Sequence, residues 1–302
     1  MITNIVSYKN PDMDGVAAMV ALKELSQKQG KQSIEYYIDD KPQMEVQLVL
    51  KKYGITLLPV ESISTSDDFI LVDCNDLGRV HKVITPQRII EVIDHHSKSE
   101  ELKNFTRAKI DIQKVGAVAT LIVERFMASE ITPSLESAIL LYHAIASNTI
   151  NLKGDVTTER DLQAFNWLQG LYSKLSQENI DDIFKQKSQV DNIEQAVLSD
   201  LKVIGTPKGK VVIAQLELAN ATEFCDKNIV HLRRIIDEIS SQTKTENIML
   251  NVIDIINGFN VVLCRSQELR NRLAKIGLKF NNDIAITKKI IMRKQFVSLL
   301  SN

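Results

Sequence analysis

The chain repeats one design three times: a short apolar segment rich in β-branched residues is followed at once by acidic residues. The three segments are 2–7 (ITNIVS) before the turn 10–15 (NPDMDG), 69–73 (FILVD) ending in Asp73, and 88–94 (RIIEVID) ending in Asp94 before His95 and His96. Short apolar runs bounded by turn residues predict buried strands. The sequence therefore predicts three buried strands, each with an acidic carboxyl end.

Helical patterns alternate with these strands. Apolar residues recur at helical spacing from Val16 to Leu25, and further helical patterns cover about 115–128, 134–146 and 158–169. Thr158 with Asp161 three residues later fits a capping box at the start of the last pattern. Strands that alternate with helices predict an α/β fold, here an N-terminal domain whose mostly parallel sheet is flanked by helices.

The second half of the chain predicts a smaller α/β domain with another order of elements. The predicted elements are strands at 210–217, 247–255 and 259–264, a helix at 226–242, and a last strand with basic residues in the tail 290–300 (IIMRKQFVSLL). Between about 175 and 200 the chain is polar and poor in strand-forming residues. We therefore expect a metal-binding domain over 1–184, a linker over 185–195 and a substrate-closing domain over 196–302.

Charge and composition exclude several classes of protein. The chain has 37 Lys and Arg against 38 Asp and Glu, whereas proteins that grip long nucleic acid usually carry a basic surplus. The three cysteines form no closely spaced pair, which argues against a disulfide scaffold. No run approaches the ~18 apolar residues of a membrane span, and the N-terminus has no apolar signal core. We therefore expect a cytoplasmic protein that binds neither a membrane nor long nucleic acid.

The acidic strand ends predict a metal site. In an open parallel sheet, ligands lie outside the carboxyl ends of the strands, so Asp12, Asp14, Asp73, Asp94 and the two histidines would meet there if the strands are neighbours. Carboxylates packed so closely repel one another unless a cation separates them. Mixed carboxylate and imidazole ligands suit Mn²⁺, Fe²⁺ or Zn²⁺ better than Ca²⁺. The alternative for each aspartate alone is a helix cap or a turn residue.

Taken together, the motifs resemble those of the DHH phosphoesterase superfamily. The resembling motifs are Asn10-Pro-Asp12-Met-Asp14-Gly15, Leu71-Val72-Asp73, Asp94-His95-His96, the loop 115–120 (VGAVAT), TTERD at 157–161, and the C-terminal stretches 209–217 and 292–300. The last two resemble the DHHA2 branch, which contains manganese-dependent (family II) inorganic pyrophosphatases and exopolyphosphatases. The tail lacks the glycine-rich GGGH-type motif of the other branch.

The resemblance implies a role for each matching residue. Asp12 would bind a first metal ion, Asp14 and His95 would bind a second, and Asp73 would bind both. His96 would assist catalysis at this centre. Asp94 would hold the neighbouring residues in place without binding an ion itself. Lys202, Arg293 and Lys294 would contact substrate phosphates. The implied cofactor is Mn²⁺, with Co²⁺ or Mg²⁺ as alternatives.

Two implied ligand positions depart from the pyrophosphatase pattern. Tyr8 stands where that family has a histidine, and Asn148 where it has an aspartate. A neutral amide binds a cation only through its oxygen, and a neutral phenol is a poor ligand. Lys9, beside Tyr8, would either contact a substrate phosphate or lie in solvent as a turn residue. His143, on an apolar helical stretch, is expected to be a core residue rather than a ligand.

These features predict a hydrolase of phosphoanhydrides or phosphoesters that uses metal-activated water, with a small phosphorylated substrate such as pyrophosphate, polyphosphate or a nucleotide. One alternative is a weakly catalytic or non-catalytic protein that binds nucleotide or polyphosphate on the same fold. Another is a phosphodiesterase acting on short oligonucleotides or cyclic dinucleotides. The resemblance also leaves a homodimer open.

Overall fold

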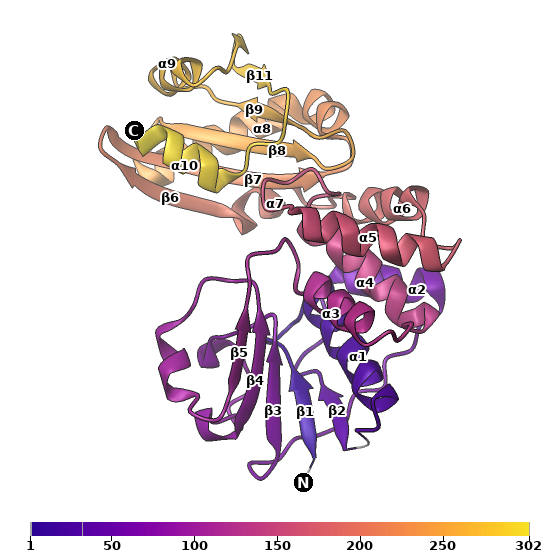
Figure 1. Cartoon of the computed structure of the whole chain (residues 1–302). Helices are drawn as coiled ribbons and strands as arrows, with labels where there is room; N and C mark the ends of the chain where they lie inside the picture. The colour runs from indigo at the N-terminus through magenta and orange to yellow at the C-terminus, as the bar shows by residue number, and fades with distance from the viewer. Residues whose placement is uncertain (1, 32, 302) are drawn as a thin grey trace. The chain divides into compact units, whose positions relative to one another are not determined.

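The computed structural model describes residues 2–31 and 33–301. The chain divides into two compact units (Figure 1). Unit 1 comprises Met1–Leu152 and Val156–Ile183, and unit 2 comprises Lys153–Asp155 and Phe184–Asn302. The predicted linker, 185–195, holds the end of one helix and the start of the next.

Unit 1 is built on a five-stranded sheet in which every neighbouring pair is parallel. Its strands, in chain order, are β1 (Thr3–Val6), β2 (Ile34–Tyr37), β3 (Asp68–Val72), β4 (Ile89–Asp94) and β5 (Lys109–Ile112). Their order across the sheet is β2-β1-β3-β4-β5, so the direction of winding reverses between β1 and β3. The predicted parallel sheet is confirmed, and its reversal point is where such sheets bind ligands.

Helices and short 3₁₀ turns surround this sheet. The helices are α1 (Met13–Lys28), α2 (Met44–Tyr53), α3 (Val118–Ala128), α4 (Leu135–Asn148), α5 (Glu159–Leu171) and α6 (Gln177–Lys187), with turns η1 (Leu77–Arg79), η2 (Pro86–Arg88) and η3 (Glu100–Asn104). Helices α1 and α3 lie against one face of the sheet (Figure 1), and α4 packs on α1. The predicted capping box at Thr158 and Asp161 is confirmed at the start of α5.

The core of unit 1 follows from the apolar strands. Every residue of β3 is buried, as are Ile5, Val92 and Ile93 in the strands on either side. Burying one such aliphatic side chain contributes about 1.5–3 kcal/mol relative to exposure. The predicted core position of His143 is also confirmed, since only 2% of this residue is exposed.

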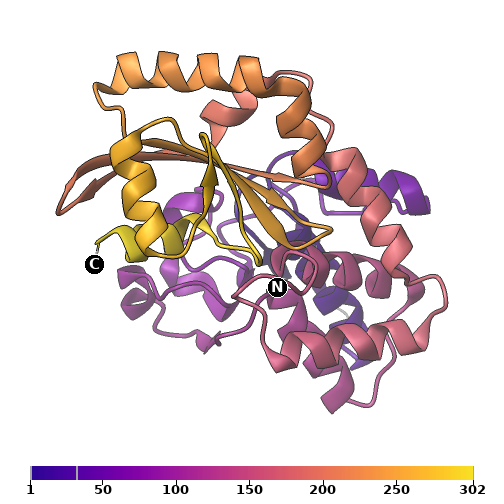
Figure 2. The same cartoon turned by 90° about the horizontal axis from the view of Figure 1, so that it is seen from above.

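Unit 2 contains a six-stranded mixed sheet of order β10-β11-β9-β8-β7-β6, in which only β7 and β8 run parallel. Its elements are α7 (Ile193–Ser199), β6 (Leu201–Thr206), β7 (Gly209–Leu218), α8 (Ala221–Thr243), β8 (Ile248–Asp254), β9 (Phe259–Leu263), α9 (Gln267–Lys275), β10 (Phe280–Asn281), β11 (Ile284–Ile286) and α10 (Arg293–Ser301). Helix α8 covers one face of the sheet, and α9 and α10 cover the other (Figure 2).

One predicted element of unit 2 is wrong. The tail was expected to form a strand, but Arg293–Ser301 is the helix α10. Phe296 and Leu300 are four residues apart and are both buried in the cluster with α9, which is helical spacing. The side chain of Gln295 accepts a hydrogen bond from Met292 N at 2.7 Å and helps to start the helix. The apolar pair before Met292 gave the tail a strand-like appearance.

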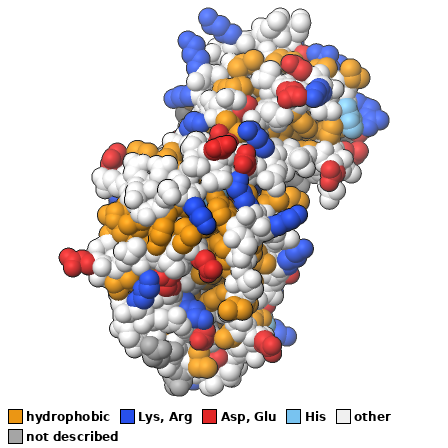
Figure 3. Space-filling model, turned by 90° about the vertical axis from the view of Figure 1, so that its right-hand side faces the viewer, with side chains coloured by type: hydrophobic (Ala, Val, Ile, Leu, Met, Phe, Trp, Pro, Cys, Tyr) orange, Lys and Arg blue, Asp and Glu red, His pale blue; other side chains and the backbone are white. Residues whose placement is uncertain are grey.

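None of the helices among the described residues is long and apolar enough to span a membrane. On the face of the molecule shown in Figure 3, Lys and Arg side chains are interspersed with Asp and Glu. This distribution agrees with the near-zero net charge of the chain.

Candidate metal centre

The carboxyl ends of β1, β3 and β4 deliver polar side chains to one place at the reversal point of the sheet. Asp73 directly follows β3 with a φ of 55°, a left-handed conformation that Asp tolerates better than most residues. His95 Nε2 lies 3.5 Å from Asp73 Oδ1 and 4.0 Å from Asp14 Oδ2. The predicted meeting of Asp14, Asp73 and His95 thus occurs in the structure.

Asp73 has a buried carboxylate oxygen without a hydrogen-bond partner. The residue is 1% exposed, and its Oδ1 receives no hydrogen bond. Burial is the largest cause that raises the pKa of Asp73 well above its usual value; the interaction with His95 opposes it, and the charges of Asp14 and Asp12 add to it. A buried anion in this state is costly unless a cation or a proton compensates it.

His95 is oriented with one ring nitrogen toward these carboxylates. Its Nδ1 lies 3.0 Å from the carbonyl oxygen of Val115, so Nδ1 carries the proton and donates it. Its Nε2 therefore faces Asp73 and Asp14, in the arrangement that fixes a metal-binding tautomer. Burial lowers the pKa of His95, but the neighbouring Asp73 and Asp14 outweigh it and raise the pKa to about 10. The site therefore attracts positive charge.

Asp94 holds the second histidine and the loop after β4. Its Oδ1 accepts hydrogen bonds from His96 Nδ1 at 2.9 Å and from the backbone of His95 and His96. Its Oδ2 accepts from Asn75 Nδ2 at 2.5 Å. Burial opposes ionisation, but the hydrogen bonds from His96 outweigh it and lower the pKa of Asp94. Asp94 is therefore an ionised anchor for the histidine pair.

Asp12 and Tyr8 lie at the start of α1. Asp12 caps this helix, because its Oδ1 accepts from the backbone of Asp14 and Gly15 at 3.1 Å. The hydroxyl of Tyr8 accepts from Asp12 N at 3.2 Å. Burial and the charges of Asp12 and Asp73 raise the pKa of Tyr8 above its usual value, so the phenol stays protonated. Tyr8 therefore supplies no anionic ligand.

Asp14 is fully buried and hydrogen-bonded by the first turn of α3 and by Asn148. Its Oδ2 accepts from Val118 N and from Asn148 Nδ2, each at 2.7 Å, and its Oδ1 accepts from Ala119 N at 2.8 Å. Burial is the largest cause that raises the pKa of Asp14, to about 6. Asn148, an expected ligand position, thus donates to Asp14 instead of presenting an anion.

The donor set fits a transition-metal ion. Among the described residues, Asp73, Asp94, His95 and His96 offer ligand atoms that lie within 4.8 Å of one another. The unpartnered oxygen of Asp73 and the oriented Nε2 of His95 are oxygen and nitrogen donors of the kind that Mn²⁺ and its neighbours accept.

Sequence reasoning missed the residues that brace this centre. Asn75 supports Asp94, and Asp161 holds the loop before α3 by accepting from Gly116 N and Thr120 Oγ1. A Cβ on Gly116 would lie 2.6 Å from Thr149, which explains the glycine there. Asp161 was predicted only as a helix cap, and its long-range contacts carry no local sequence signal.

The predicted phosphate-binding residues lie at the surface. Lys9 is exposed, with its Nζ 3.9 Å from Asp39. In unit 2, Lys202 and Lys294 are exposed, and Arg293 pairs with Asp200 at 2.7 Å.

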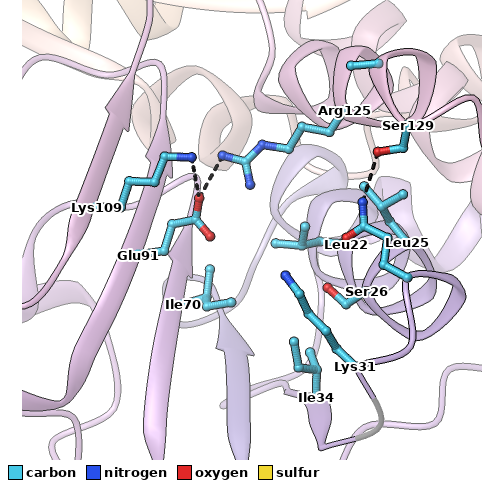
Figure 4. Close-up of a pocket in the computed structure, with 12 residues that line it drawn as sticks. Leu22, Leu25, Ser26, Lys31, Ile34, Ile70, Glu91, Lys109, Arg125 and Ser129 are labelled. Carbon is cyan, nitrogen blue, oxygen red and sulfur yellow. Dashed lines mark hydrogen bonds and ion pairs between the residues drawn. The ribbon is translucent and has the colours of Figure 1, made fainter.

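A separate cavity lies in unit 1 between the sheet and the C-terminal ends of α1 and α3. It encloses about 250 Å³ and is lined by residues including Leu22, Lys31 and Ile70. In Figure 4, the carboxylate of Glu91 is contacted by both Lys109 and Arg125. Three charged side chains that line the cavity are therefore paired with one another.

Residues 3–146 match the family model described as "DHH family, N-terminal domain". This match confirms, for the N-terminal part of the chain, the resemblance seen in the motifs.

Two bacterial relatives are each described as "probable manganese-dependent inorganic pyrophosphatase". The one from Oceanobacillus iheyensis is 24% identical over 314 residues and spans 99% of this chain and 98% of the relative. The one from Staphylococcus aureus is 25% identical over 302 residues and spans 97% and 95%. Each relative is thus similar to this chain over nearly the whole length of both proteins.

A crystal structure from Methanococcus jannaschii, described as a "putative family II inorganic pyrophosphatase", has the same fold. It aligns with a TM-score of 0.63 at 22% identity and covers 99% of this chain and 98% of that chain. The predicted fold class is therefore confirmed.

Proposed function

We propose that the protein hydrolyses a small phosphoanhydride in a reaction that requires a divalent metal ion. Inorganic pyrophosphate is the first candidate substrate, because the relatives that span nearly the whole chain carry that activity in their descriptions. Short polyphosphate is the second candidate.

The proposal rests above all on the unpartnered carboxylate oxygen of Asp73, which is buried and faces the oriented Nε2 of His95. Asp73 and His95 would bind the ion, with the carboxylates of Asp12 and Asp14 as its acidic neighbours, and Mn²⁺ would be preferred over Co²⁺ or Mg²⁺. Such an ion supplies charge for phosphate oxygens and makes a water molecule more acidic.

His96 is proposed to act on the substrate through its free ring nitrogen. Its Nδ1 is held by Asp94, and its side chain is 49% exposed. When the ring is doubly protonated, Nε2 can donate a hydrogen bond to a phosphate oxygen or its proton to the leaving group, and the charge of Asp94 stabilises that cation. Asp94 keeps the ring in this orientation.

Basic residues of unit 2 are proposed to bind the phosphate groups of the substrate. Lys202 and Lys294 are exposed cations, and Arg293 offers a planar guanidinium that suits phosphate. Arg293 would have to exchange its present partner, Asp200, for the substrate. Lys9 of unit 1 is a further candidate contact.

The test is a hydrolysis assay with Mn²⁺, Co²⁺ or Mg²⁺ and with pyrophosphate, tripolyphosphate and a dinucleotide. Asp73→Asn should lower metal-dependent turnover roughly 100-fold or more, because it removes the anion at the centre. Asp76→Asn is the matched control, since Asp76 is exposed and caps only the turn η1. Equal turnover in the wild type and Asp73→Asn would contradict the proposal.

A second candidate is a protein that binds nucleotide or polyphosphate without efficient turnover. The observation in its favour is Asn148, whose neutral amide donates a hydrogen bond to Asp14 where the resemblance implied an anionic ligand. Bound metal and bound pyrophosphate without hydrolysis of any substrate in the panel would select this function. Turnover of the dinucleotide alone would select a phosphodiesterase.

A further inference from the structure

Asp14 has little capacity left to bind a metal ion. A carboxylate oxygen offers two lone pairs in its plane, and Asp14 Oδ2 already accepts two short hydrogen bonds, from Val118 N and Asn148 Nδ2. The other oxygen accepts from Ala119 N. Backbone donors at a helix N-terminus and a side-chain amide thus compensate this buried charge.

The saturated oxygen is also the one nearest His95. The distance of 4.0 Å between Asp14 Oδ2 and His95 Nε2 spans the position that an ion shared by these residues would take. An ion there would have to displace the Asn148 amide from a bond of 2.7 Å. Displacement would cost this hydrogen bond, and Asn148 would have to turn its side chain over to offer the ion a neutral amide oxygen in place of an anion.

Asp73 presents the opposite situation. Its Oδ1 is buried, accepts no hydrogen bond, and lies 3.5 Å from His95 Nε2. Asp73 therefore keeps a buried oxygen that can accept a metal ion, whereas both oxygens of Asp14 already accept hydrogen bonds.

We propose that the centre holds one divalent ion per chain, bound by Asp73 and His95, and that Asn148 replaces a second ion beside Asp14. This inference rests on the proposed metal-dependent function, but it concerns the number of ions and not the reaction. Asp14 then serves as the cap of α3 and positions the loop that carries Val115, the partner of His95 Nδ1.

The number of ions can be measured without an activity assay. The full chain, stripped with a chelator and titrated with Mn²⁺, should bind one ion by calorimetry and native mass spectrometry. Its electron paramagnetic resonance spectrum should be that of an isolated Mn²⁺ ion. Asn148→Asp should raise the stoichiometry from one to two and give the spectrum of a magnetically coupled pair, because an added carboxylate would face Asp14 and require a cation.

Asn104→Asp is the matched control, because it adds the same charge at an exposed position of η3 and should keep one ion. Two ions in the wild type, or no ion at all, would overturn the inference. Because this result comes from the wild type, it tests the number of ions even if the Asn148→Asp variant fails to fold. One ion in a folded Asn148→Asp variant would overturn the role of Asn148. One ion without hydrolysis of any substrate would leave the inference standing and remove the proposed hydrolase function.

Discussion

His143 is a buried histidine that has a structural partner and no place in the metal centre. Its Nε2 lies 3.1 Å from the hydroxyl of Tyr53, and the two rings are tilted against each other. Burial lowers its pKa to about 4. The ring therefore stays neutral in the folded protein at pH values where an unfolded histidine, with a pKa of about 6.5, becomes protonated.

This difference predicts how stability depends on pH. Between pH 6.5 and 4 the unfolded chain binds a proton at His143 that the folded chain does not, so the free energy of unfolding falls as the pH falls. The slope from this group is at most about 1.4 kcal/mol per pH unit. In His143→Gln, which keeps a hydrogen-bonding group near Tyr53, urea unfolding between pH 7 and 4.5 should lose this part of the slope. Identical slopes in both proteins would assign the pH dependence to other groups.

Single residues also mark the limit of sequence reasoning about the site. Asp73, Asp94 and His95 were predictable, because each stands at the end of an apolar strand and parallel strands end at one edge. The hydrogen bond from Asn148 to Asp14 was not predictable, since the two residues are 134 positions apart. The sequence shows that Asn148 stands where an anionic ligand is implied. It does not show which residue the Asn148 side chain contacts, because that depends on how the helices pack.

At the scale of elements, a buried polar network in unit 2 holds the segment that leads into α10. Asn260 Nδ2 donates to Ile291 O at 2.7 Å and to Asn251 Oδ1 at 2.5 Å, and Asn260 Oδ1 accepts from Ile291 N at 3.0 Å. Gln215 accepts from Arg293 N at 2.9 Å. The basic residues at the start of α10 are thus tied to β7, β8 and β9.

Removing the centre of this network should loosen that segment. Asn260→Ala leaves several buried partners unsatisfied, at about 1–3 kcal/mol each, so we expect the free energy of unfolding to fall by about 2–4 kcal/mol. If Arg293 binds substrate, KM for pyrophosphate should rise more than kcat falls. The control is Asn257→Ala, at an exposed position just before β9, which should change stability by less than about 0.5 kcal/mol. Equal effects of the two variants would contradict the role of the network.

The same segment explains why one element was mispredicted. Strong apolar runs, such as those of β3 and β8, identify strands because every residue is buried. In α10 only Phe296 and Leu300 are fully buried, and the helix spans nine residues, too short for the periodicity to stand out beside the preceding Ile290 and Ile291. Edge strands such as β2 and β5 were also missed, since each has only four residues, of which two are buried in β2 and none in β5.

At the scale of the whole molecule, the two units have separate hydrophobic cores. The sequence predicted two α/β domains from the polar stretch between them, but it could not give the strand order of the second sheet. There β11 pairs with β9, so the order depends on long-range antiparallel contacts. Whether the two units also act as the metal-binding and substrate-closing domains stays a prediction.

Separate cores predict a local response to metal. A ligand at about 100 times its Kd stabilises the structure that binds it by about 2.7 kcal/mol. Hydrogen exchange should therefore show that saturating Mn²⁺ protects amides of β3, β4 and the first turn of α3, which carry or brace the proposed ligands.

Amides of β7 and β8 should remain unchanged, because they belong to the other core and can open independently. A chelator should reverse the protection, and Asp73→Asn should prevent it. If β7 gained as much protection as β3, the chain would unfold as one cooperative body and the ion would stabilise both units together. Exchange rates that Mn²⁺ left unchanged in β3 and β4 would instead remove the metal centre from unit 1.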